Sequence, residues 1–263
     1  MIHLDTVIQQ SQELQSGFRN LLYHKSLVMA DGFQAYDGFC RALPAIYRTD
    51  LGKIIYNRRN QLREIEYGGH TFVVKSYQIP HLINRLVYGF LRPSKARRSY
   101  EYAEMLVHQG FGSPQPVAYY TERFLGLFFG RSYFVSLKSE CPYTYEDVMN
   151  HRIEREDEVL QAIGQTTARL HNAGMIHMDY SRGNILIGFN AEGDVKIELI
   201  DLNRIRFRKI SVKEGLANLF ERLPADERHH THQSSFRAES DLPTQQFFPQ
   251  HKPTATSAAH CPA

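Results

Sequence analysis

The chain has 263 residues, 42% of them hydrophobic and 22% charged, so it can bury a substantial core in one large domain or two small lobes. This composition and a formal net charge of +3 argue against wholesale disorder. The three cysteines are too few and too far apart to indicate a disulfide framework or a zinc site, which favours a reducing compartment.

Neither the N-terminus nor any apolar run predicts secretion or a membrane span. The first residues do not join a basic segment to an apolar one, as a signal peptide does. The longest apolar run, residues 124–129, is far shorter than the roughly 20 residues that cross a bilayer. We therefore expect a cytoplasmic protein that is soluble or, at most, peripheral at a membrane surface.

Residues 1–33 are expected to form an N-terminal helical extension. Residues 6–28 are polar and rich in glutamine, with apolar side chains at roughly helical spacing, which predicts a helix. This helix either docks on the following domain or lies outside it. A second, shorter helix is predicted over residues 33–47.

Residues 34–140 are expected to form a strand-rich lobe with one embedded helix. The Gly68-Gly69 pair between two segments rich in β-branched and aromatic residues is a strong hairpin signal. The embedded helix is predicted over residues 95–109, and Gly110 fits its C-terminal cap. The expected strands are residues 53–57, 62–67, 71–77, 117–121 and 131–137.

Residues 141–227 are expected to form a helical lobe. A long amphipathic helix is predicted over residues 157–173, and Gly174 ends it. Residues 228–263 are rich in His, Ser, Thr, Gln and Pro and poor in aliphatic side chains, which predicts a disordered tail. The other elements expected in this lobe are helices at residues 145–150 and 212–222 and a strand at residues 195–201.

The short stretch at residues 177–184 carries the clearest chemistry. It reads His-x-Asp-x-x-x-x-Asn, with Asp179 and Asn184 as its acid and amide, and a second acid, Asp201, ends a later strand pattern. Metal–nucleotide phosphotransfer requires such groups, because oxygen ligands hold Mg²⁺ and a carboxylate holds the acceptor hydroxyl. The plainer alternative is two ordinary turn residues and a strand-end cap.

The order of these elements and motifs resembles the two-lobed protein-kinase-like fold, an α+β architecture. Within that fold, it is most similar to the bacterial lipopolysaccharide core and Kdo kinase family. The resemblance covers about residues 34–227. The features that carry it are Val73-Val74-Lys75, Lys95–Ala103, Ser113-Pro114-Gln115-Pro116, the stretch from His177 to Asn184, and Ile200-Asp201.

The resemblance implies a role for each candidate site residue. Lys75, on the third strand, would hold the α- and β-phosphates of ATP and pair with Glu101 on the embedded helix. Asp179 would be the catalytic aspartate at the acceptor hydroxyl. Asn184 and Asp201 would be the Mg²⁺ ligands.

Some of these assignments compete with plainer ones. Glu104 lies one turn after Glu101 on the same helix face, and either glutamate can be solvated. Lys75 can also be an ordinary strand lysine whose stem lies along the surface. The basic groups around residues 92–98 and 204–209 are solvated faces by default; otherwise they grip phosphorylated sugars or an anionic membrane surface.

Several features depart from protein kinases. The turn at residues 57–60 has no glycine, so Arg, Asn or backbone donors must replace a glycine-rich phosphate loop. The triplet that starts at Asp201 is Asp-Leu-Asn, Ser181 stands where many protein kinases have lysine, and no Ala-Pro-Glu follows. These departures favour a small-molecule or glycolipid kinase. Because residues 228–263 cannot supply further apolar helices, the C-terminal lobe is either minimal or truncated or altered.

We therefore expect an ATP- and Mg²⁺-dependent kinase that phosphorylates a sugar hydroxyl of lipopolysaccharide core, on Kdo or heptose. The expected partners are a sugar or glycolipid substrate and the anionic inner-membrane surface, without nucleic acid. Two alternatives stay open. One is a catalytically inactive kinase-like binding module, and the other is a kinase that acts on a protein or a small metabolite.

Overall fold

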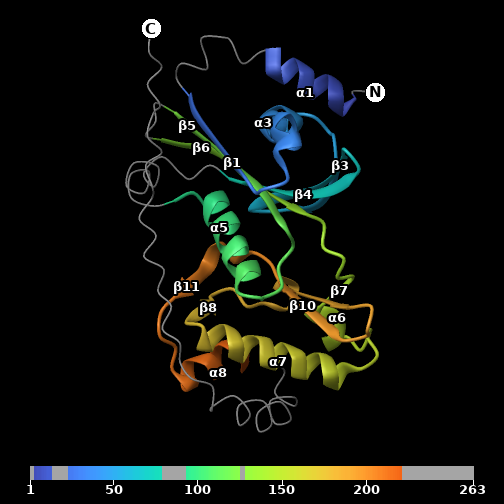
Figure 1. Ribbon diagram of the computed structural model, residues 1–263, viewed down its shortest axis with the longest axis vertical. Coiled ribbons are helices and arrows are strands. Elements are labelled where there is room, and N and C mark those ends of the chain that lie inside the picture. Colours follow the sequence, from blue (N-terminus) through green and yellow to red (C-terminus); the bar gives the residue numbers. More distant parts are fainter. Residues whose placement is uncertain (1–2, 14–22, 79–92, 125–127, 221–263) are drawn as a thin grey trace.

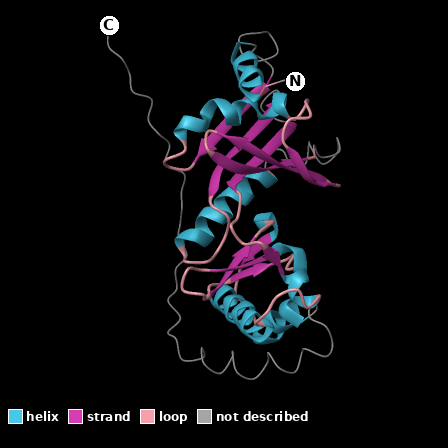
Figure 2. Cartoon of the chain, turned by 90° about the vertical axis from the view of Figure 1, so that its right-hand side faces the viewer, coloured by secondary structure: helices cyan, strands magenta, loops and turns pink. Residues whose placement is uncertain are grey.

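The computed structural model describes residues 3–13, 23–78, 93–124 and 128–220, and these form two lobes (Figure 1). One lobe is built on a broad antiparallel sheet, and the other combines helices with short strands (Figure 2). Helix α5 (Lys95–His108) lies between them. No helix in these described ranges is long and apolar enough to cross a membrane.

The N-terminal lobe contains a six-stranded antiparallel sheet in the order β1-β5-β6-β4-β3-β2. All five strands predicted in this region are confirmed, and most are longer than expected. In chain order the strands are β1 (Tyr23–Met29), β2 (Lys53–Asn57), β3 (Asn60–Tyr67), β4 (His70–Tyr77), β5 (Pro116–Phe124) and β6 (Phe128–Leu137).

The β3–β4 hairpin places the first candidate site residue. Gly68 and Gly69 both have positive φ angles, of 56° and 82°, as a tight hairpin turn requires. Along β4, Phe72 and Val74 are fully buried in the core of the lobe. Since side chains alternate across a strand, Lys75 points to the opposite face of the sheet.

The N-terminal helix predicted over residues 6–28 is largely wrong. Helix α1 spans only Leu4–Glu13, residues 14–22 lie outside the described part, and residues 23–29 form strand β1 of the sheet. Strand β1 pairs with β5 along its whole length, so its backbone gains ladder hydrogen bonds that helical spacing cannot reveal. The expected helical extension therefore ends before residue 23.

The second predicted helix is confirmed as α3 (Asp37–Ile46), preceded by the short turn η2 (Gln34–Tyr36). Helix α3 covers the sheet face opposite to Lys75. Its Phe39 and Leu43 are fully buried and belong to one core cluster with Phe72 of β4. Helix α1 lies against the outer side of α3 and extends this layer (Figure 1).

Helix α5 confirms the embedded helix predicted over residues 95–109. It begins where the Ser94 side chain accepts a hydrogen bond from the Arg97 N–H at 3.1 Å, an N-terminal cap. Shortly after its end, Gly110 has a φ of +74°, which a glycine adopts without strain. The helix is thus fixed at both ends by the residue types that its sequence supplies.

The C-terminal lobe packs its long helix and its short strands around one core. The helices expected at residues 145–150, 157–173 and 212–222 and the strand at 195–201 are confirmed within a few residues. The predicted disordered tail, residues 228–263, lies outside the described part. The elements are β7 (Tyr143–Thr144), α6 (Tyr145–Met149), α7 (Glu156–Asn172), β8 (Met175–His177), η3 (Arg182–Asn184), β9 (Ile185–Phe189), β10 (Val195–Leu199), η4 (Leu202–Arg204), β11 (Ile205–Phe207) and α8 (Val212–Phe220).

Candidate active site

The stretch between β8 and η3 forms a loop that His177 braces from within. The His177 imidazole is fully buried, its Nδ1 accepts the Asp179 N–H at 3.1 Å, and its Nε2 donates to the Ile200 carbonyl at 3.0 Å. These contacts require the neutral ring with hydrogen on Nε2. Burial lowers the pKa of His177, which also favours the neutral form. His177 therefore ties the Asp179 loop to the strand end that precedes Asp201.

Asn184 links the same two segments. Its side-chain Nδ2 donates to the Asp179 carbonyl at 2.8 Å, and its backbone carbonyl accepts the Ile200 N–H at 3.0 Å. The side-chain oxygen of Asn184 is left to act as an acceptor or a metal ligand. Asp179, Asn184 and Asp201, which were predicted to act together, are thus brought to one place by the backbone itself.

Asp201 connects this loop to the N-terminal lobe. One carboxylate oxygen lies 2.7 Å from the Lys75 Nζ, and the two side chains are only 25% and 12% exposed. This shielding makes the pair stronger than an exposed ion pair, which contributes at most about 1 kcal/mol. Asp201 also accepts a hydrogen bond from the Asn203 side chain and has a left-handed backbone, with φ of 57°.

The expected ion pair between Lys75 and Glu101 is not formed. Glu101 instead binds the Arg97 guanidinium, Nε to Oε1, at 2.6 Å, and both side chains are exposed. The α5 side chain that faces β4 is Ser99, which is buried and hydrogen-bonded to the Tyr77 hydroxyl at 2.6 Å. Two residues turn a helix by about 200°, so Glu101 projects away from that face.

The alternative glutamate does not reach Lys75 either. Glu104 instead accepts a hydrogen bond from the Tyr100 hydroxyl at 2.5 Å. Neither glutamate therefore supplies the partner that the family resemblance implied. Asp201 takes that place and holds Lys75 across the gap between the lobes.

Several basic side chains lie near these carboxylates. The default prediction from the sequence was that they are solvated. Arg204 Nη1 lies 3.2 Å from an Asp179 carboxylate oxygen, and Arg98 Nη1 donates to the Asn203 carbonyl at 2.9 Å. Burial lowers the pKa of Lys95, and the neighbouring charges of Arg98 and Arg204 lower it further. We call Lys75, Lys95, Arg98 and Arg204 the cationic cluster.

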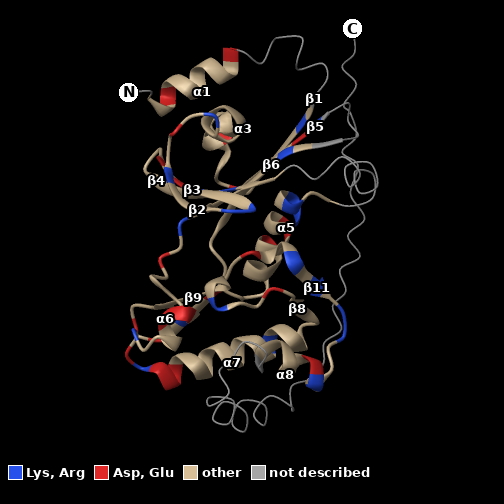
Figure 3. Cartoon of the chain, turned by 180° about the vertical axis from the view of Figure 1, so that it is seen from behind, with Lys and Arg blue, Asp and Glu red and all other residues tan. Residues whose placement is uncertain are grey.

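The cationic cluster joins segments that are far apart in the chain. Basic stretches on α5 and around β11 lie close to each other between the lobes (Figure 3). The sequence offered one signal for this cluster: Arg204 follows the Asp-Leu-Asn triplet directly. With four cations against Asp179 and Asp201, the site carries excess positive charge and suits a polyanion.

Helix α8 contacts the start of the Asp179 loop through Asn218. Asn218 donates from Nδ2 to the His177 carbonyl at 3.1 Å, and its Oδ1 accepts from His171 Nε2 of α7 at 3.2 Å. Gly215 lets the two helices approach, because a Cβ there would lie 2.8 Å from the His171 ring. Asn218 therefore joins α8, α7 and the start of the Asp179 loop.

Replacing Asn218 should destabilise the protein. Asn218→Ala removes both hydrogen bonds and leaves the His177 carbonyl and the buried His171 without this partner, so we expect the free energy of unfolding to fall by about 1–3 kcal/mol. Urea denaturation followed by circular dichroism measures this change. Lys213→Ala, on the exposed side of the same helix, is the control and should change little; equal losses in both variants would contradict the bridging role.

The two buried histidines should make the protein acid-sensitive. Burial lowers the pKa of both His171 and His177, so below about pH 6.5 the unfolded chain binds protons that the folded chain does not. Their contribution to stability is complete above that pH and is lost as the pH falls toward the lowered values. Denaturant unfolding at a series of pH values should show this decline, and His171→Gln should flatten it, whereas replacing the exposed His151 should not.

Comparisons with known proteins agree with this architecture. The family model described as "Lipopolysaccharide kinase (Kdo/WaaP) family" matches residues 75–233, more than half of the chain. No curated protein matches the chain. The matched segment begins at Lys75 and includes the Asp179 loop, Asn184 and Asp201.

A solved structure has the same fold. The structure titled "WaaP in complex with acyl carrier protein" is 18% identical, with 81% of this chain and 89% of that chain covered and a TM-score of 0.54. A Stt7 homologue from Micromonas algae, soaked with ATP, is 13% identical over 59% of this chain and 49% of that chain, with a TM-score of 0.43, too weak a likeness to inform the site. The chain has the two-lobed protein-kinase-like fold and belongs to the lipopolysaccharide kinase (Kdo/WaaP) family.

Proposed function

We propose that the protein transfers the γ-phosphate of ATP to a sugar hydroxyl of lipopolysaccharide core, on Kdo or heptose, with the help of Mg²⁺. The observation that carries this proposal is the meeting of Lys75 from one lobe with Asp201 from the other, beside Asp179 and Asn184. Phosphoryl transfer depends mainly on positioning and charge neutralisation, and these residues supply both.

Each residue has a defined task in this proposal. Asp179 aligns the acceptor hydroxyl and accepts its proton late in the reaction, while Asn184 and Asp201 hold Mg²⁺ through oxygen atoms. The donor set fits this ion, because it combines the Asp201 carboxylate with the Asn184 side-chain oxygen, which accepts no hydrogen bond within the part of the chain that the structure describes. When bound, the ion neutralises charge on the phosphates. Lys75 leaves Asp201 and binds the α- and β-phosphates instead.

The cationic cluster replaces the missing glycine-rich loop. The β2–β3 turn presents Arg58 and Arg59, both exposed, where a glycine-rich loop would lie, so backbone amides are not arranged there by glycine. Lys95 and Arg98 reach the site from the first turn of α5, and Arg204 reaches it from η4. We propose that these side chains grip the triphosphate together with Lys75.

Removing one of these cations should weaken ATP binding. We expect Lys95→Ala to raise the KM for ATP by about tenfold with a smaller effect on kcat, since one charged contact to phosphate is lost. Steady-state kinetics at saturating acceptor measures both values. Arg97→Ala is the matched control, because Arg97 lies on the same helix but binds Glu101. A KM that is unchanged in Lys95→Ala, or raised equally in Arg97→Ala, would contradict this role.

Mass spectrometry of the products tests the identity of the acceptor. Purified core glycolipid incubated with the protein, ATP and magnesium should gain the mass of one phosphate group, and tandem fragmentation should place it on Kdo or heptose. Phosphate found only on a protein mixture or on small metabolites, offered in parallel, would overturn the proposed acceptor while leaving a kinase.

An inactive kinase-like binding module is the second candidate. One observation favours it: Lys75 has no glutamate partner on α5 and instead occupies Asp201, the expected metal ligand. An inactive module predicts that ATP with Mg²⁺ leaves the melting temperature unchanged, whereas a working site should raise it because ligand binds only the folded chain. Thermal unfolding with ATP, with and without magnesium, separates these candidates.

We place the reaction at the cytoplasmic face of the inner membrane, where a peripheral enzyme can meet a glycolipid. The likeness to a WaaP structure that contains acyl carrier protein also suggests a protein partner for this chain. Co-purification of the full chain with acyl carrier protein, and its flotation with anionic vesicles, test these two associations separately.

A further inference from the structure

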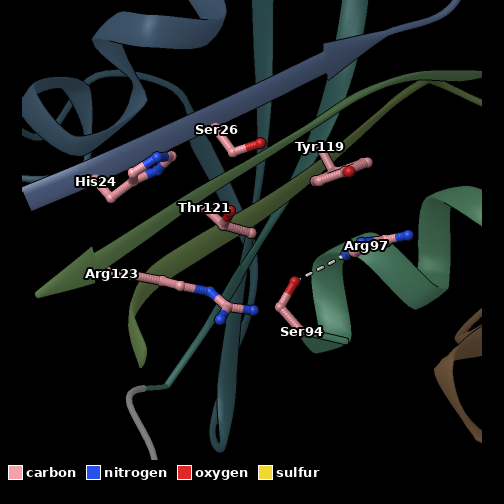
Figure 4. A pocket seen from close by; sticks show the side chains of 7 residues that line it. All are labelled: His24, Ser26, Ser94, Arg97, Tyr119, Thr121 and Arg123. Carbon is pink, nitrogen blue, oxygen red and sulfur yellow. Dashed lines mark hydrogen bonds between the residues drawn. The ribbon is translucent and has the colours of Figure 1, made fainter. Parts of the chain in front are cut away.

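A second basic site lies on the far side of α5 from the cationic cluster. It is a pocket of about 280 Å³ between the β1–β5 strand pair and the N-terminal end of α5 (Figure 4). Among the described residues that line it, three side chains are basic and four carry hydroxyl groups, and none is acidic. The lining includes none of the carboxylates or cations of the active site.

The register of two paired strands builds one wall. His24 lies directly opposite Arg123, and Ser26 lies directly opposite Thr121, so these four side chains share one face of the sheet. The alternate residues of the same strands face the other way, and Tyr120, for example, is buried in the core under α3. The strand pair therefore offers an apolar face to the core and a polar, basic face to the pocket.

Helix α5 closes the pocket on the other side. Ser94 caps the helix, Arg97 follows in its first turn, and the Arg123 side chain points from the sheet toward Ser94 (Figure 4). Arg97 uses Nε for Glu101, and its guanidinium has further N–H donors. Ser94 and Thr121 are each only 8% exposed, whereas the His24 and Arg97 side chains are exposed, so the pocket combines buried hydroxyl groups with basic groups that face solvent.

The donors that line this pocket suit an anion. Two guanidinium groups, one of which already binds Glu101 through Nε, lie with an imidazole and four hydroxyl groups on separate elements, and none of the described lining residues is acidic. The helix N-terminus adds a favourable field for negative charge. The volume lies near the lower end of the roughly 300–1,000 Å³ of ligand pockets, which suits a phosphate group and part of its carrier.

We propose that this pocket binds a phosphate monoester, carried by a sugar or by a lipid headgroup. Arg123 and Arg97 supply the charged hydrogen bonds, and Thr121 and Ser26 supply hydroxyl donors. Because Ser94 and Arg97 belong to α5, the ligand joins this helix to β1 and β5. The site does not depend on the proposed transfer reaction and stands even if that reaction is not catalysed.

Calorimetric titration of the full chain tests the site directly. Nucleotide binding is measured first, with a non-hydrolysable ATP analogue and magnesium, so that a failure of the proposed kinase site is recorded separately. With the analogue at saturation, the chain is titrated with inorganic phosphate, with glucose 6-phosphate and with phosphatidylcholine vesicles that contain phosphatidic acid. Glucose and pure phosphatidylcholine vesicles serve as uncharged counterparts.

Matched variants locate the binding. Arg123→Gln should weaken phosphate binding by roughly tenfold or more, since one charged hydrogen-bonding group is lost. Thr121→Val keeps the side-chain shape, removes one hydroxyl donor and should weaken binding less. Lys25→Gln removes a positive charge from the opposite face of β1 and should leave binding unchanged.

Each possible result either supports or contradicts the proposal. Binding of glucose 6-phosphate or of phosphatidic acid vesicles that is lost in Arg123→Gln and kept in Lys25→Gln supports the proposal, and the probe that binds identifies the carrier. The proposal is overturned if no phosphate probe binds the analogue-saturated chain, if Arg123→Gln and Thr121→Val both bind like the wild type, or if Lys25→Gln is equally impaired.

Discussion

Asp179→Asn is expected to lower kcat for phosphate transfer by a factor of about 10²–10⁴, the range that a positioned proton acceptor contributes. Among the described residues, the Asp179 carboxylate contacts only Arg204, whose Nη1 lies 3.2 Å from a carboxylate oxygen. The loop itself is held through the main chain of Asp179, by His177 at the N–H and by Asn184 at the carbonyl. Asp179→Asn should therefore preserve the hydrogen bonds that hold the loop and remove only the carboxylate that would accept the proton.

Stability and binding measurements separate this effect from misfolding. Asp179→Asn should melt at nearly the wild-type temperature and should still be stabilised by ATP with magnesium. Asp157→Asn, an exposed acid on α7, is the matched control and should retain full activity. If Asp179→Asn kept more than about half of the wild-type kcat, Asp179 would not be the catalytic aspartate.

Asp201→Asn is expected to abolish magnesium-dependent transfer almost completely, by a factor of at least about 10²–10³, because it removes the carboxylate of the proposed metal site. Asp201 sits in the left-handed backbone region, with φ of 57° and ψ of 43°. Asparagine adopts this region more easily than most residues, so the substitution changes the carboxylate and not the backbone. Lys75 also loses its partner.

Two measurements test the prediction for Asp201→Asn. In Asp201→Asn, transfer should not be restored by raising magnesium to the level that saturates the wild type, and the magnesium-dependent part of ATP stabilisation should disappear. Asp194→Asn, at an exposed turn of the same lobe, serves as the control. Wild-type dependence on magnesium in Asp201→Asn would show that another group holds the metal.

The sequence predicted what depends on near neighbours along the chain. Alternating side chains and the Gly68-Gly69 turn specified the β3–β4 hairpin, and with it the direction of Lys75. Asp179 and Asn184 are only five residues apart, the Asn184 side chain binds the Asp179 carbonyl, and the Asp179 N–H binds the nearby His177 side chain. Local pattern therefore placed Asp179, Asn184 and Asp201 correctly relative to one another.

Contacts between distant segments decided the rest. Strand β1 becomes a strand because β5, more than 80 residues later, pairs with it, and nothing near residue 23 signals this. The family resemblance predicted Glu101 as the partner of Lys75, but the rotation of α5 turns Ser99 toward β4 instead. The sequence did not predict the cationic cluster for the same reason. Lys95 and Arg204 lie near each other only because the two lobes pack together.

The Lys75–Asp201 pair also suggests how the site limits repulsion between its carboxylates. Each candidate catalytic carboxylate has a basic partner, Lys75 for Asp201 and Arg204 for Asp179. These partners lie where the phosphates of a nucleotide are expected, so the same cations can serve the carboxylates before binding and the phosphates afterwards. The arrangement makes a glutamate on α5 less necessary for holding Lys75.

The most direct test measures transfer of labelled γ-phosphate from ATP to purified lipopolysaccharide core glycolipid, by the wild type and Asp179→Asn side by side, with a generic protein mixture as competing acceptor. We predict that the wild type labels the glycolipid only with magnesium, and that Asp179→Asn labels neither acceptor although it binds ATP. Equal labelling by both proteins, or a wild type that binds ATP and magnesium but labels no glycolipid, would contradict the proposed function.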